Sequence, residues 1–320
     1  MQYAGCFLNL LKMENKYDVI ILGGGPAGLT AGIYLSRSGI NTVILNEGIT
    51  GGQMSLTHKI ANYPGVPDVS GYMLSRTMQK QAESFGCKVL SNVKISDYDF
   101  MGDEKKIKTE RRGTFISKAV IIASGGKSRE LKVPGEKEFA GKGISYCATC
   151  DGDFFRDKEI IVVGGGNSAL EEAVALTQYA SKVTVVHEFD YFQAHKKAVE
   201  EAKNHPKIEF ILNSTISAFY GSMSLEKAVV KNLKTGQEYD MKIDGVFIFI
   251  GYVPQTKPFK SILSLNKRDE IIVNENMMTN IPGIFAAGDC TAKRYRQITT
   301  AVSDGTIAAL NVIEYIQNQL

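Results

Sequence analysis

Two cysteines separated by two residues, Cys147 and Cys150, form the pattern in this chain with the most direct chemical meaning. Such a pair at a turn can close into a small disulfide ring, and the pKa of a suitably placed thiol can fall to about 7. Reduced, the pair could exchange with a partner's disulfide through a mixed-disulfide intermediate. Asp151 follows directly and is a natural proton donor and acceptor for a leaving thiolate. The pattern therefore indicates dithiol–disulfide exchange.

A close cysteine pair can also be half of a structural zinc site or simply two buried thiols. A zinc site needs two further ligands, usually another close pair. No such pair accompanies Cys147, because the remaining cysteines are isolated and the histidines are scattered: Cys6, Cys87, Cys290, His58, His187, His195 and His205. The same isolation disfavours an iron–sulfur cluster in this chain. We expect no metal site and prefer the redox interpretation.

A dinucleotide-binding pattern near the start of the chain suggests what exchanges electrons with this pair. Residues 17–22 are a continuous apolar run, typical of a buried parallel strand, and lead into a glycine turn at residues 23–28. A helical pattern, a second apolar run at residues 42–45 and Glu47 follow. Such a turn lets the backbone approach a pyrophosphate, and the carboxylate lies where a ribose hydroxyl would be. With the strands, the helix and the acidic residue all present beside the turn, the signal is stronger than glycines alone.

The same pattern recurs later in the chain. A strand is expected at residues 159–163, a glycine turn at 164–169, a helix through residue 176 and a strand at 182–186. An offset of 141 residues separates both Gly23 from Gly164 and Glu47 from Glu188. Two dinucleotide folds in one chain imply one bound flavin and one site built for a second nucleotide. The second copy could also be a relic that packs but binds nothing.

Three further apolar strands, near residues 120–126, 246–251 and 284–289, end in glycine turns, where ligands of open α/β sheets bind. We therefore predict an α/β protein with two Rossmann-like, three-layer dinucleotide-binding domains, the second inserted into the first. The flavin domain would comprise residues 16–126 and 251–320, and the inserted domain residues 127–250, with the cysteine pair. Residues 1–15 would be an N-terminal extension. The polar segment 97–113 is expected to be a hairpin or loop edge.

Composition narrows the class of protein. The apolar fraction of 44% and the charged fraction of 22% are those of a soluble globular protein. A net charge of +3 is too small to indicate nucleic-acid binding. No apolar run reaches the roughly 18–20 residues of a membrane span, and the first 15 residues make a poor signal peptide. Because the five cysteines show no regular even spacing, we expect a reducing, cytoplasmic compartment.

Several motifs together resemble those of the low-molecular-weight thioredoxin reductases, in that family's order. They are the turn at 23–28, G-G-Q at 51–53, N-Y-P-G at 62–65, the highly specific C-A-T-C-D-G at 147–152, and Gly288-Asp289 with Arg296-Gln297. The similarity covers nearly the whole chain after residue 13. It implies an FAD enzyme that reduces thioredoxin, with Cys150 nearer the flavin, Cys147 as the exchanging thiol and Asp151 as the acid–base group. It also implies a homodimer and a rotation of the inserted domain that alternately shows the disulfide to flavin and to thioredoxin.

The same resemblance implies which residues bind FAD. They come from the first glycine motif, from the segments that follow the strands, and from the start of the last helix: Gly23, Gly25, Pro26, Ala27, Gly28, Glu47, Gly52, Gln53, Asn62, Val93, Gly125, Gly288, Asp289, Arg296, Gln297 and Ile298.

The chain departs from NADPH-dependent members of that family at the arginine motif, H-R-R-x-x-x-R, that holds the 2′-phosphate. The matching positions are His187, Glu188, Phe189 and Gln193, so the three arginines are missing and a carboxylate is present. Hydrogen bonds to a charged group contribute about 1.5–3 kcal/mol each, so NADPH binding should be weakened by orders of magnitude. The lysines that follow, at 196 and 197, are poor replacements for a planar fork.

We therefore rank reduced ferredoxin first as electron donor, NADH second and NADPH third. The chain looks like the ferredoxin-dependent flavin thioredoxin reductases of anaerobic bacteria, which keep C-A-T-C and FAD but have lost the use of pyridine nucleotides. Bulky aromatics at residues 189–192 agree with that loss, and basic clusters at 196–197 and 294–296 could meet an acidic ferredoxin. NADH stays open because Glu188 matches the ribose-binding carboxylate beside an intact glycine turn.

Two further functions would use the same residues. In a dithiol oxidase the redox centre runs backwards and oxygen discharges the reduced flavin, so peroxide formed from a dithiol in air would identify it. A non-enzymatic flavoprotein sensor would signal by domain rotation. The intact set Cys147, Cys150 and Asp151 disfavours the sensor. The lone cysteines carry no evident role, and Cys290 is expected to be a small buried side chain.

Overall fold

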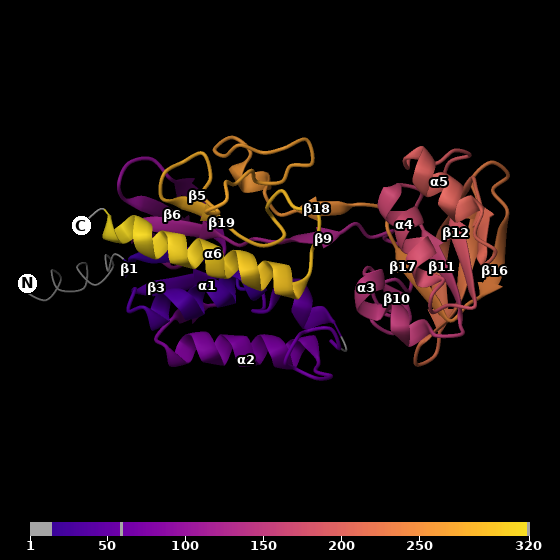
Figure 1. The fold of residues 1–320 in the computed structure, drawn as a ribbon, viewed down its shortest axis with the longest axis horizontal. Helices are drawn as coiled ribbons and strands as arrows, with labels where there is room; N and C mark the ends of the chain where they lie inside the picture. The colour runs from indigo at the N-terminus through magenta and orange to yellow at the C-terminus, as the bar shows by residue number, and fades with distance from the viewer. Residues whose placement is uncertain (1–14, 58–59, 319–320) are drawn as a thin grey trace, which may run out of the picture. The chain divides into compact units, whose positions relative to one another are not determined.

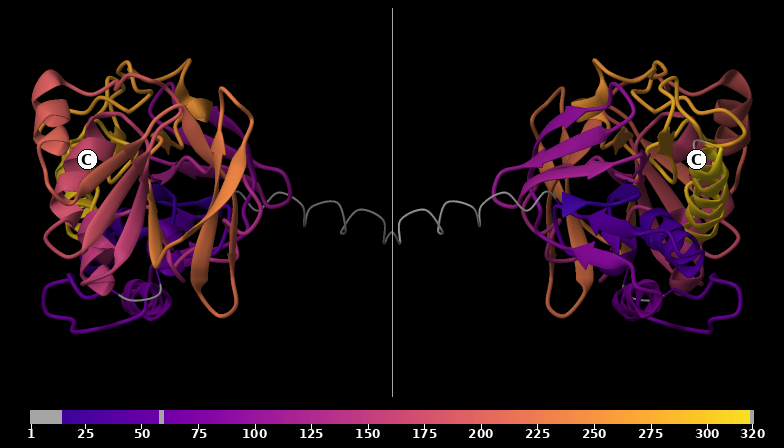
Figure 2. Two further views of the ribbon diagram at one scale, coloured as in Figure 1. Left: turned by 90° about the vertical axis from the view of Figure 1, so that its right-hand side faces the viewer. Right: turned by 90° about the vertical axis from the view of Figure 1, so that its left-hand side faces the viewer.

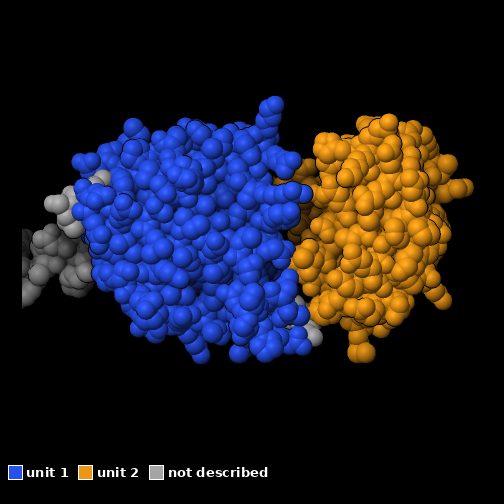
Figure 3. Space-filling view, in the orientation of Figure 1, with its two compact units in different colours: residues 1–127, 254–320 blue, residues 128–253 orange. Residues whose placement is uncertain are grey.

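The computed structural model describes residues 15–57 and 60–318, so Cys6, His58 and the expected N-terminal extension up to residue 14 lie outside the described part. The chain divides into two compact units. Unit 1 combines the chain up to residue 127 with Pro254–Leu320, and unit 2 is Ser128–Val253, coloured blue and orange in Figure 3. Because the chain leaves unit 1 and later returns to it, the two stretches of unit 1 are far apart in sequence.

A five-stranded parallel sheet with the order β19-β8-β2-β3-β4 forms the centre of unit 1. Its strands are short and largely apolar: β2 (Val19–Leu22), β3 (Thr42–Leu45), β4 (Lys88–Leu90), β8 (Ala119–Ile122) and β19 (Ile284–Ala286). Neighbouring residues of one strand contribute to opposite cores, as Ile20 and Ile21 do. Burial of both faces explains why these strands read as continuous apolar runs rather than alternating ones.

Three helices cover one face of this sheet, as Figure 1 shows: α1 (Pro26–Arg37), α2 (Gly71–Ser84) and α6 (Ile298–Gln317). Leu29 of α1, Leu74 of α2 and Val312 of α6 meet Ile21 in one buried core. The Ser70 hydroxyl accepts a hydrogen bond from the Met73 N–H at 3.2 Å and so caps α2. The short helix η2 (Gly52–Leu56) precedes α2.

A second, four-stranded sheet covers the other face of the parallel sheet in unit 1. Its order is β1-β7-β6-β5, with β1 (Asn15–Lys16), β7 (Gly113–Ser117), β6 (Lys105–Thr109) and β5 (Ile95–Asp99). Phe115 of this sheet and Phe259 of the short helix η4 (Lys257–Phe259) pack with Ile20 in the second core. The polar segment expected to be a hairpin or loop edge is the antiparallel hairpin β5–β6 and the turn into β7.

Unit 2 repeats this plan with a parallel sheet of order β10-β17-β11-β12-β13. The strands are β10 (Ile144–Ser145), β11 (Glu159–Val163), β12 (Lys182–Val186), β13 (Ile208–Ile211) and β17 (Gly245–Ile248). Helices lie on one face: α3 (Ala148–Asp151), η3 (Gly152–Phe155), α4 (Asn167–Leu176) and α5 (Lys196–Lys203). An antiparallel sheet of β14 (Ser214–Gly221), β15 (Leu225–Asn232) and β16 (Glu238–Lys242) covers the other, as Figure 2 shows.

Each unit is therefore a three-layer α/β domain in which helices, a parallel sheet and an antiparallel sheet are stacked in that order. This confirms the predicted fold class. The chain passes between the units through β9 (Gly126–Ser128) and β18 (Tyr252–Pro254), which form a two-stranded sheet. In the described part of the chain, no helix has the length and apolar character to cross a membrane.

Candidate functional site

Cys147 and Cys150 are joined in a disulfide at the start of α3, directly after β10. Cys147 is the N-cap residue of this helix, and its sulfur accepts a hydrogen bond from the Cys150 N–H at 3.2 Å. Both cysteines are half-buried. Because a backbone donor stabilises negative charge on sulfur, the same contact would favour a thiolate at Cys147 once the disulfide is reduced.

Asp151 lies next to this disulfide and is held by Ser145. The Ser145 hydroxyl donates a hydrogen bond to Asp151 Oδ2 at 2.6 Å. Burial raises the pKa of the Asp151 carboxyl above its usual value, the Ser145 hydrogen bond opposes this effect, and the negative charge of Asp153 adds to it. A carboxyl with a raised pKa can take up and release a proton nearer neutral pH, which suits an acid–base group beside a pair of thiols.

The residues just before the disulfide are fixed by a buried carboxylate, Glu136. It accepts hydrogen bonds from the N–H groups of Leu131 and Lys132, at 2.9 and 2.6 Å, and from the Tyr146 hydroxyl at 2.9 Å. Burial and the Glu136 carboxylate raise the pKa of Tyr146 well above its usual range, so its hydroxyl remains a donor. The network ties Tyr146, the residue before Cys147, to the loop of unit 2 that contains Leu131, Lys132 and Glu136.

The first glycine turn follows β2 at the carboxyl end of the parallel sheet in unit 1. Gly23 has a φ of +115°, and a Cβ there would collide with the carbonyl oxygen of Ala123. A Cβ on Gly28 would collide with the Gly23 carbonyl. Gly25, the N-cap of α1, differs, because a Cβ there would meet nothing within 4 Å. Open space therefore adjoins the backbone at a helix N-terminus that no side chain caps, which is where a pyrophosphate would fit.

Segments that follow other strands of this sheet converge on the same turn. The Gly24 N–H donates to Asn46 Oδ1 at 2.9 Å, and the Gly51 N–H donates to the Gly24 carbonyl at 2.7 Å. The Val93 N–H donates to the Asn46 carbonyl at 2.9 Å. Asn46 thus joins the ends of β2, β3 and β4, and Glu47, the expected ribose ligand, is the exposed residue beside it.

The start of α6 belongs to the same region of unit 1. Gln297 is the N-cap of α6, and its side-chain oxygen accepts a hydrogen bond from Asn62 Nδ2 at 3.4 Å. The Gly288 N–H donates to Asp304 Oδ2 at 3.0 Å, and the same carboxylate forms an ion pair with Lys293. Since the Lys293 and Asp304 side chains are 13% and 11% exposed, this pair is largely desolvated.

Charged side chains of the loop between Asp289 and Gln297 form ion pairs with other residues of unit 1, which the sequence did not indicate. Arg296 forms an ion pair with the buried Glu270. Of the cluster at 294–296 that could meet an acidic partner, Arg296 is therefore paired within unit 1, and Arg294 is exposed, lying over the Tyr295 ring at 5.1 Å. Burial raises the pKa of Asp289, against the lowering effect of Lys293 and Arg296.

The remaining residues expected to bind FAD also lie in unit 1. Pro26 and Ala27 are in the first turn of α1, Gln53 is exposed in η2, Gly125 follows β8, and Ile298 begins α6. The sequence reasoning missed several residues that support this region: Asn46, Glu270 and Asp304. An asparagine directly after β3 could have been noticed, but nothing local marks Glu270 or Asp304, whose partners are distant in sequence.

The second glycine turn, in unit 2, is covered by the chain's own loop. The His187 ring packs so closely on Gly165 that a Cβ there would collide with it. The Gln193 N–H donates to the Gly165 carbonyl at 2.9 Å, and the His195 N–H donates to Asn167 Oδ1 at 2.7 Å. The loop after β12 therefore folds back onto the turn and onto the first residue of α4.

Four rings of this loop, His187, Phe189, Tyr191 and Phe192, form what we call the aromatic cluster. His187 stacks on Phe192 with ring centres 5.7 Å apart, and Phe189 stacks on Tyr191 at 5.4 Å. His187 Nε2 lies 3.0 Å from the Tyr191 carbonyl oxygen, and burial lowers its pKa. Glu188 is exposed, so a carboxylate, the Phe189 ring and the Gln193 amide occupy the positions of the three arginines.

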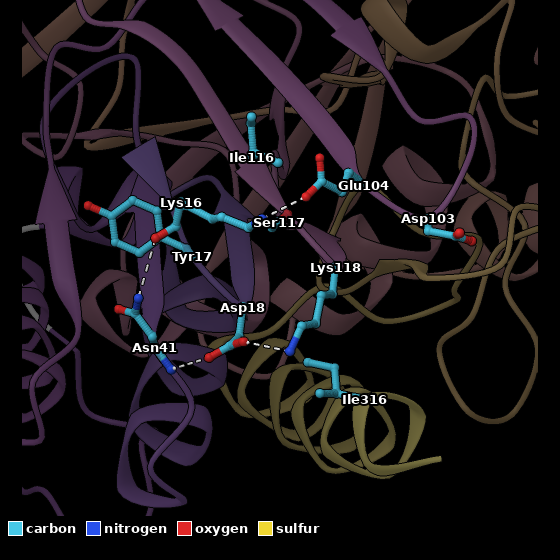
Figure 4. Close-up of a pocket in the computed structure, with 10 residues that line it drawn as sticks. All are labelled: Lys16, Tyr17, Asp18, Asn41, Asp103, Glu104, Ile116, Ser117, Lys118 and Ile316. Atoms are coloured by element: carbon cyan, nitrogen blue, oxygen red, sulfur yellow. Dashed lines mark hydrogen bonds and ion pairs between the residues drawn. The ribbon is translucent and has the colours of Figure 1, made fainter. Parts of the chain in front are cut away.

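A cavity of about 730 Å³ in unit 1 lies at the amino ends of the parallel strands, whereas the first glycine turn lies at their carboxyl ends. Figure 4 shows Asp18 between Asn41 and Lys118, which approach its carboxylate at 3.2 and 3.1 Å. Lys16 and Glu104, 2.8 Å apart, form a second ion pair in its wall. Since these charges satisfy one another and ligands of such sheets bind at the opposite ends of the strands, we assign this cavity no function.

Comparisons with known proteins identify the family to which this chain is similar. The family described as pyridine nucleotide-disulphide oxidoreductase matches residues 17–305. A 34.2 kDa protein in the rubredoxin operon of Clostridium pasteurianum is 46% identical over 311 residues, which are 96% of this chain and 99% of that protein. Thioredoxin reductase of Peptoclostridium acidaminophilum is 45% identical over 95% of this chain and 98% of its own length. The crystal structure of thioredoxin reductase from Streptococcus pyogenes is 42% identical, covers 95% of this chain and 99% of its own, and has a TM-score of 0.91.

Proposed function

The chain belongs to the low-molecular-weight thioredoxin reductases of the pyridine nucleotide-disulphide oxidoreductase family, and we propose that it reduces oxidised thioredoxin with electrons from reduced ferredoxin. The disulfide between Cys147 and Cys150 carries the first half of the proposal. The replacement of the expected phosphate-binding arginines by Glu188 and the aromatic cluster carries the second.

The protein is an FAD-dependent disulfide oxidoreductase, like the other members of its family. Bound FAD supplies the electron pair that reduces the disulfide. In unit 1, the uncapped α1 N-terminus at Gly25 fits a pyrophosphate, and we propose Glu47 as the ribose ligand. The other residues proposed to bind FAD are those of the first glycine turn and of the segments that converge on it: Gly23, Pro26, Ala27, Gly28, Gly52, Gln53, Asn62, Val93, Gly125, Gly288, Asp289, Arg296, Gln297 and Ile298.

The reduced cysteine pair then passes its electrons on by thiol–disulfide exchange. The Cys147 thiolate attacks one sulfur of the acceptor's disulfide, which forms a mixed disulfide and releases the other acceptor sulfur as a thiolate. The Cys150 thiolate attacks Cys147, re-forms the Cys147–Cys150 disulfide and releases the second acceptor thiolate. Two electrons and two protons leave the enzyme, and the acceptor becomes a dithiol. The Cys150 N–H, 3.2 Å from Cys147 Sγ, supports Cys147 as the attacking thiolate.

Asp151 handles the proton of this exchange in our proposal. It takes the proton of Cys150 as that thiol attacks the mixed disulfide, and it passes this proton to the acceptor thiolate that leaves. Burial raises the pKa of this carboxyl, which supports both the uptake and the release of a proton near neutral pH.

The second glycine turn supports a donor other than NADPH. Exposed Glu188 would repel a 2′-phosphate, and Phe189 and Tyr191 offer it no charged donor. Asp190, the next acidic residue, pairs with Lys234 at 3.2 Å. The name of the Clostridium pasteurianum relative places it in a rubredoxin operon, which supports an iron protein as a one-electron donor.

The donor is tested by the anaerobic loss of flavin absorbance on adding NADPH, NADH or reduced ferredoxin, each alone. We expect bleaching by ferredoxin only and the return of colour when oxidised thioredoxin is added. Rapid bleaching by NADH or NADPH would overturn the choice of donor and leave the reductase intact. A Cys150→Ser variant is the control, because its flavin should still bleach with ferredoxin while thioredoxin fails to restore the colour.

We further propose that the enzyme is a homodimer in the reducing cytosol. The dimer rests on the resemblance to thioredoxin reductases, and the compartment rests on the irregular spacing of the five cysteines. Light scattering coupled to gel filtration should give a mass near twice the 35.0 kDa of one chain. A monomer at micromolar concentration would contradict the proposed assembly.

A further inference from the structure

We propose that Ser145 is a positioning residue of the redox centre, whose hydroxyl holds the Asp151 carboxyl and the Cys147 backbone in one fixed arrangement. The inference rests on the proposed function, because Asp151 acts only if the Cys147–Cys150 disulfide turns over. Its effect is exerted through the Asp151 carboxyl and through the backbone of Cys147, the N-cap residue.

Three contacts of the Ser145 hydroxyl carry the proposal. Its oxygen lies 2.6 Å from Asp151 Oδ2, 3.1 Å from the Cys147 N–H nitrogen and 3.3 Å from the Cys147 carbonyl oxygen. A hydroxyl has one proton to donate and can accept on its lone pairs. The shortest contact assigns the proton to Asp151, and the Cys147 N–H donates to the hydroxyl oxygen. With Oδ2 held by Ser145, Oδ1 is the oxygen left to exchange protons with the thiols.

The strand that carries Ser145 is itself firmly held. Ser145 is 4% exposed and lies opposite Phe247 in the parallel pairing of β10 with β17. The Val246 N–H donates to the Gly143 carbonyl at 2.8 Å at the start of the same pairing. By contrast, α3 is a helix of only four residues, which has little stability of its own. Ser145 therefore links the sheet of unit 2 to the short helix that contains the reactive groups.

The charges around Asp151 make this link chemically specific. Besides β10, which carries Ser145, the elements η3 and α4 pack against α3, and their acidic side chains are Asp153, Glu171 and Glu172. Burial and then Asp153 raise the pKa of Asp151, whereas the Ser145 hydrogen bond lowers it. Loss of the hydroxyl would remove the hydrogen bond that lowers the pKa of Asp151, so this pKa would rise further.

The test uses the FAD-loaded full-length enzyme, reduced anaerobically with one equivalent of dithionite. The rate at which the Cys147–Cys150 dithiol is oxidised by thioredoxin, and separately by a small aromatic disulfide, is followed as a function of pH. The step requires Asp151 as a base, so the rate falls as pH drops through its pKa. In Ser145→Ala the acidic limb of the pH–rate profile should move to higher pH by roughly one unit. At a fixed pH on this limb, the rate of the variant should therefore be about tenfold lower than that of the wild type.

Two variants separate positioning from general damage. Ser145→Thr keeps the hydroxyl and should restore the wild-type limb. Ser214→Ala is the matched control, because Ser214 is another buried serine of unit 2 that donates only to a nearby backbone carbonyl, that of Leu212, at 2.9 Å. It should leave the limb in place.

A double-mutant cycle with Asp151→Asn guards against misfolding as the explanation. If Ser145 acts through Asp151, Ser145→Ala should lower the rate of dithiol oxidation by less than about twofold in the Asp151→Asn background. An unmoved limb in Ser145→Ala, or an equal loss at every pH, would overturn the proposal. Failure of the proposed function would look different, because the wild type would then react with the small disulfide and not with thioredoxin.

Discussion

The two glycine turns of this chain share one local architecture and differ in what lies against them. In unit 1 the second glycine of the turn, Gly24, is bound by Asn46 and Gly51 from neighbouring segments. In unit 2 the equivalent Gly165 is packed under the His187 ring and bound by the backbone of Gln193. In both units the third glycine, Gly25 or Gly166, is the N-cap of a helix that no side chain caps, and a Cβ there would meet nothing within 4 Å.

This difference teaches that the glycine motif determines a backbone shape and that the residues after the second strand determine the ligand. β3 is followed by Asn46 and the exposed Glu47, whereas β12 is followed by His187 and the aromatic cluster. A turn that permits close approach of a phosphate is necessary for nucleotide binding, and we propose that Glu188, where a partner of the 2′-phosphate would stand, makes the second turn insufficient for NADPH.

The largest effect is expected from a matched pair of substitutions, Gly25→Val and Gly166→Val. A Cβ at either position meets nothing within 4 Å, and neither glycine has a positive φ, so both variants should fold. Gly25→Val should fill the space proposed for the pyrophosphate and weaken FAD binding by about 100-fold or more, about 2.8 kcal/mol. Gly166→Val should change neither FAD content nor ferredoxin-driven turnover. Fluorescence titration of the apoenzyme with FAD measures the first effect, and equal FAD loss in both variants would contradict the contrast.

The next largest effect is expected from substitutions that give the second glycine turn the ability to bind NADPH. Restoring the three arginines with Glu188→Arg, Phe189→Arg and Gln193→Arg should speed flavin bleaching by NADPH by about 100-fold, since each charge-assisted contact contributes about 1.5–3 kcal/mol. Bleaching by NADH should change far less, because it lacks the 2′-phosphate. Glu188→Arg alone serves as the control for removing the repulsion. If NADPH still fails to bleach the flavin of the triple variant, the folded-back loop, rather than the missing positive charge, prevents NADPH from binding.

The smallest effect concerns the support that α6 gives to the first site. Asp304→Ala removes the acceptor of the Gly288 N–H and the partner of Lys293, and it should weaken FAD binding by about tenfold, because an unsatisfied buried N–H costs about 1–3 kcal/mol. Asp304→Asn keeps an acceptor and should cost less than about threefold. Asp240→Ala, which breaks the exposed Lys227 ion pair in unit 2, is the control and should have no effect on FAD. Equal affinities in all three would refute a role for Asp304.

Sequence reasoning was most successful where the chemistry is local. The strand at 42–45, the helix that ends at Leu176 and the strand at 182–186 coincide with β3, α4 and β12, and the helix after the first turn begins earlier than expected, at Pro26. The disulfide pairing of Cys147 with Cys150 could be anticipated because two intervening residues already bring the sulfurs within reach. The role of the basic cluster at 294–296 stays a prediction, and the sequence did not reveal that Glu270 lies close enough to pair with Arg296.

By itself, the sequence determined two glycine turns, the parallel strands that lead into them, and a cysteine pair with an adjacent carboxylate, because each depends on residues within one turn of the chain. Only the tertiary structure decided that Ser145 holds Asp151, that Asn46 joins three strand ends, and that His187 lies on Gly165. The contacts of Asn46 and His187 arise when strands from separate parts of the chain align their carboxyl ends at one edge of a sheet, and that of Ser145 arises when the chain turns from β10 into α3. Their partners are set by packing and hydrogen-bond geometry in three dimensions, which no local pattern of residue types encodes.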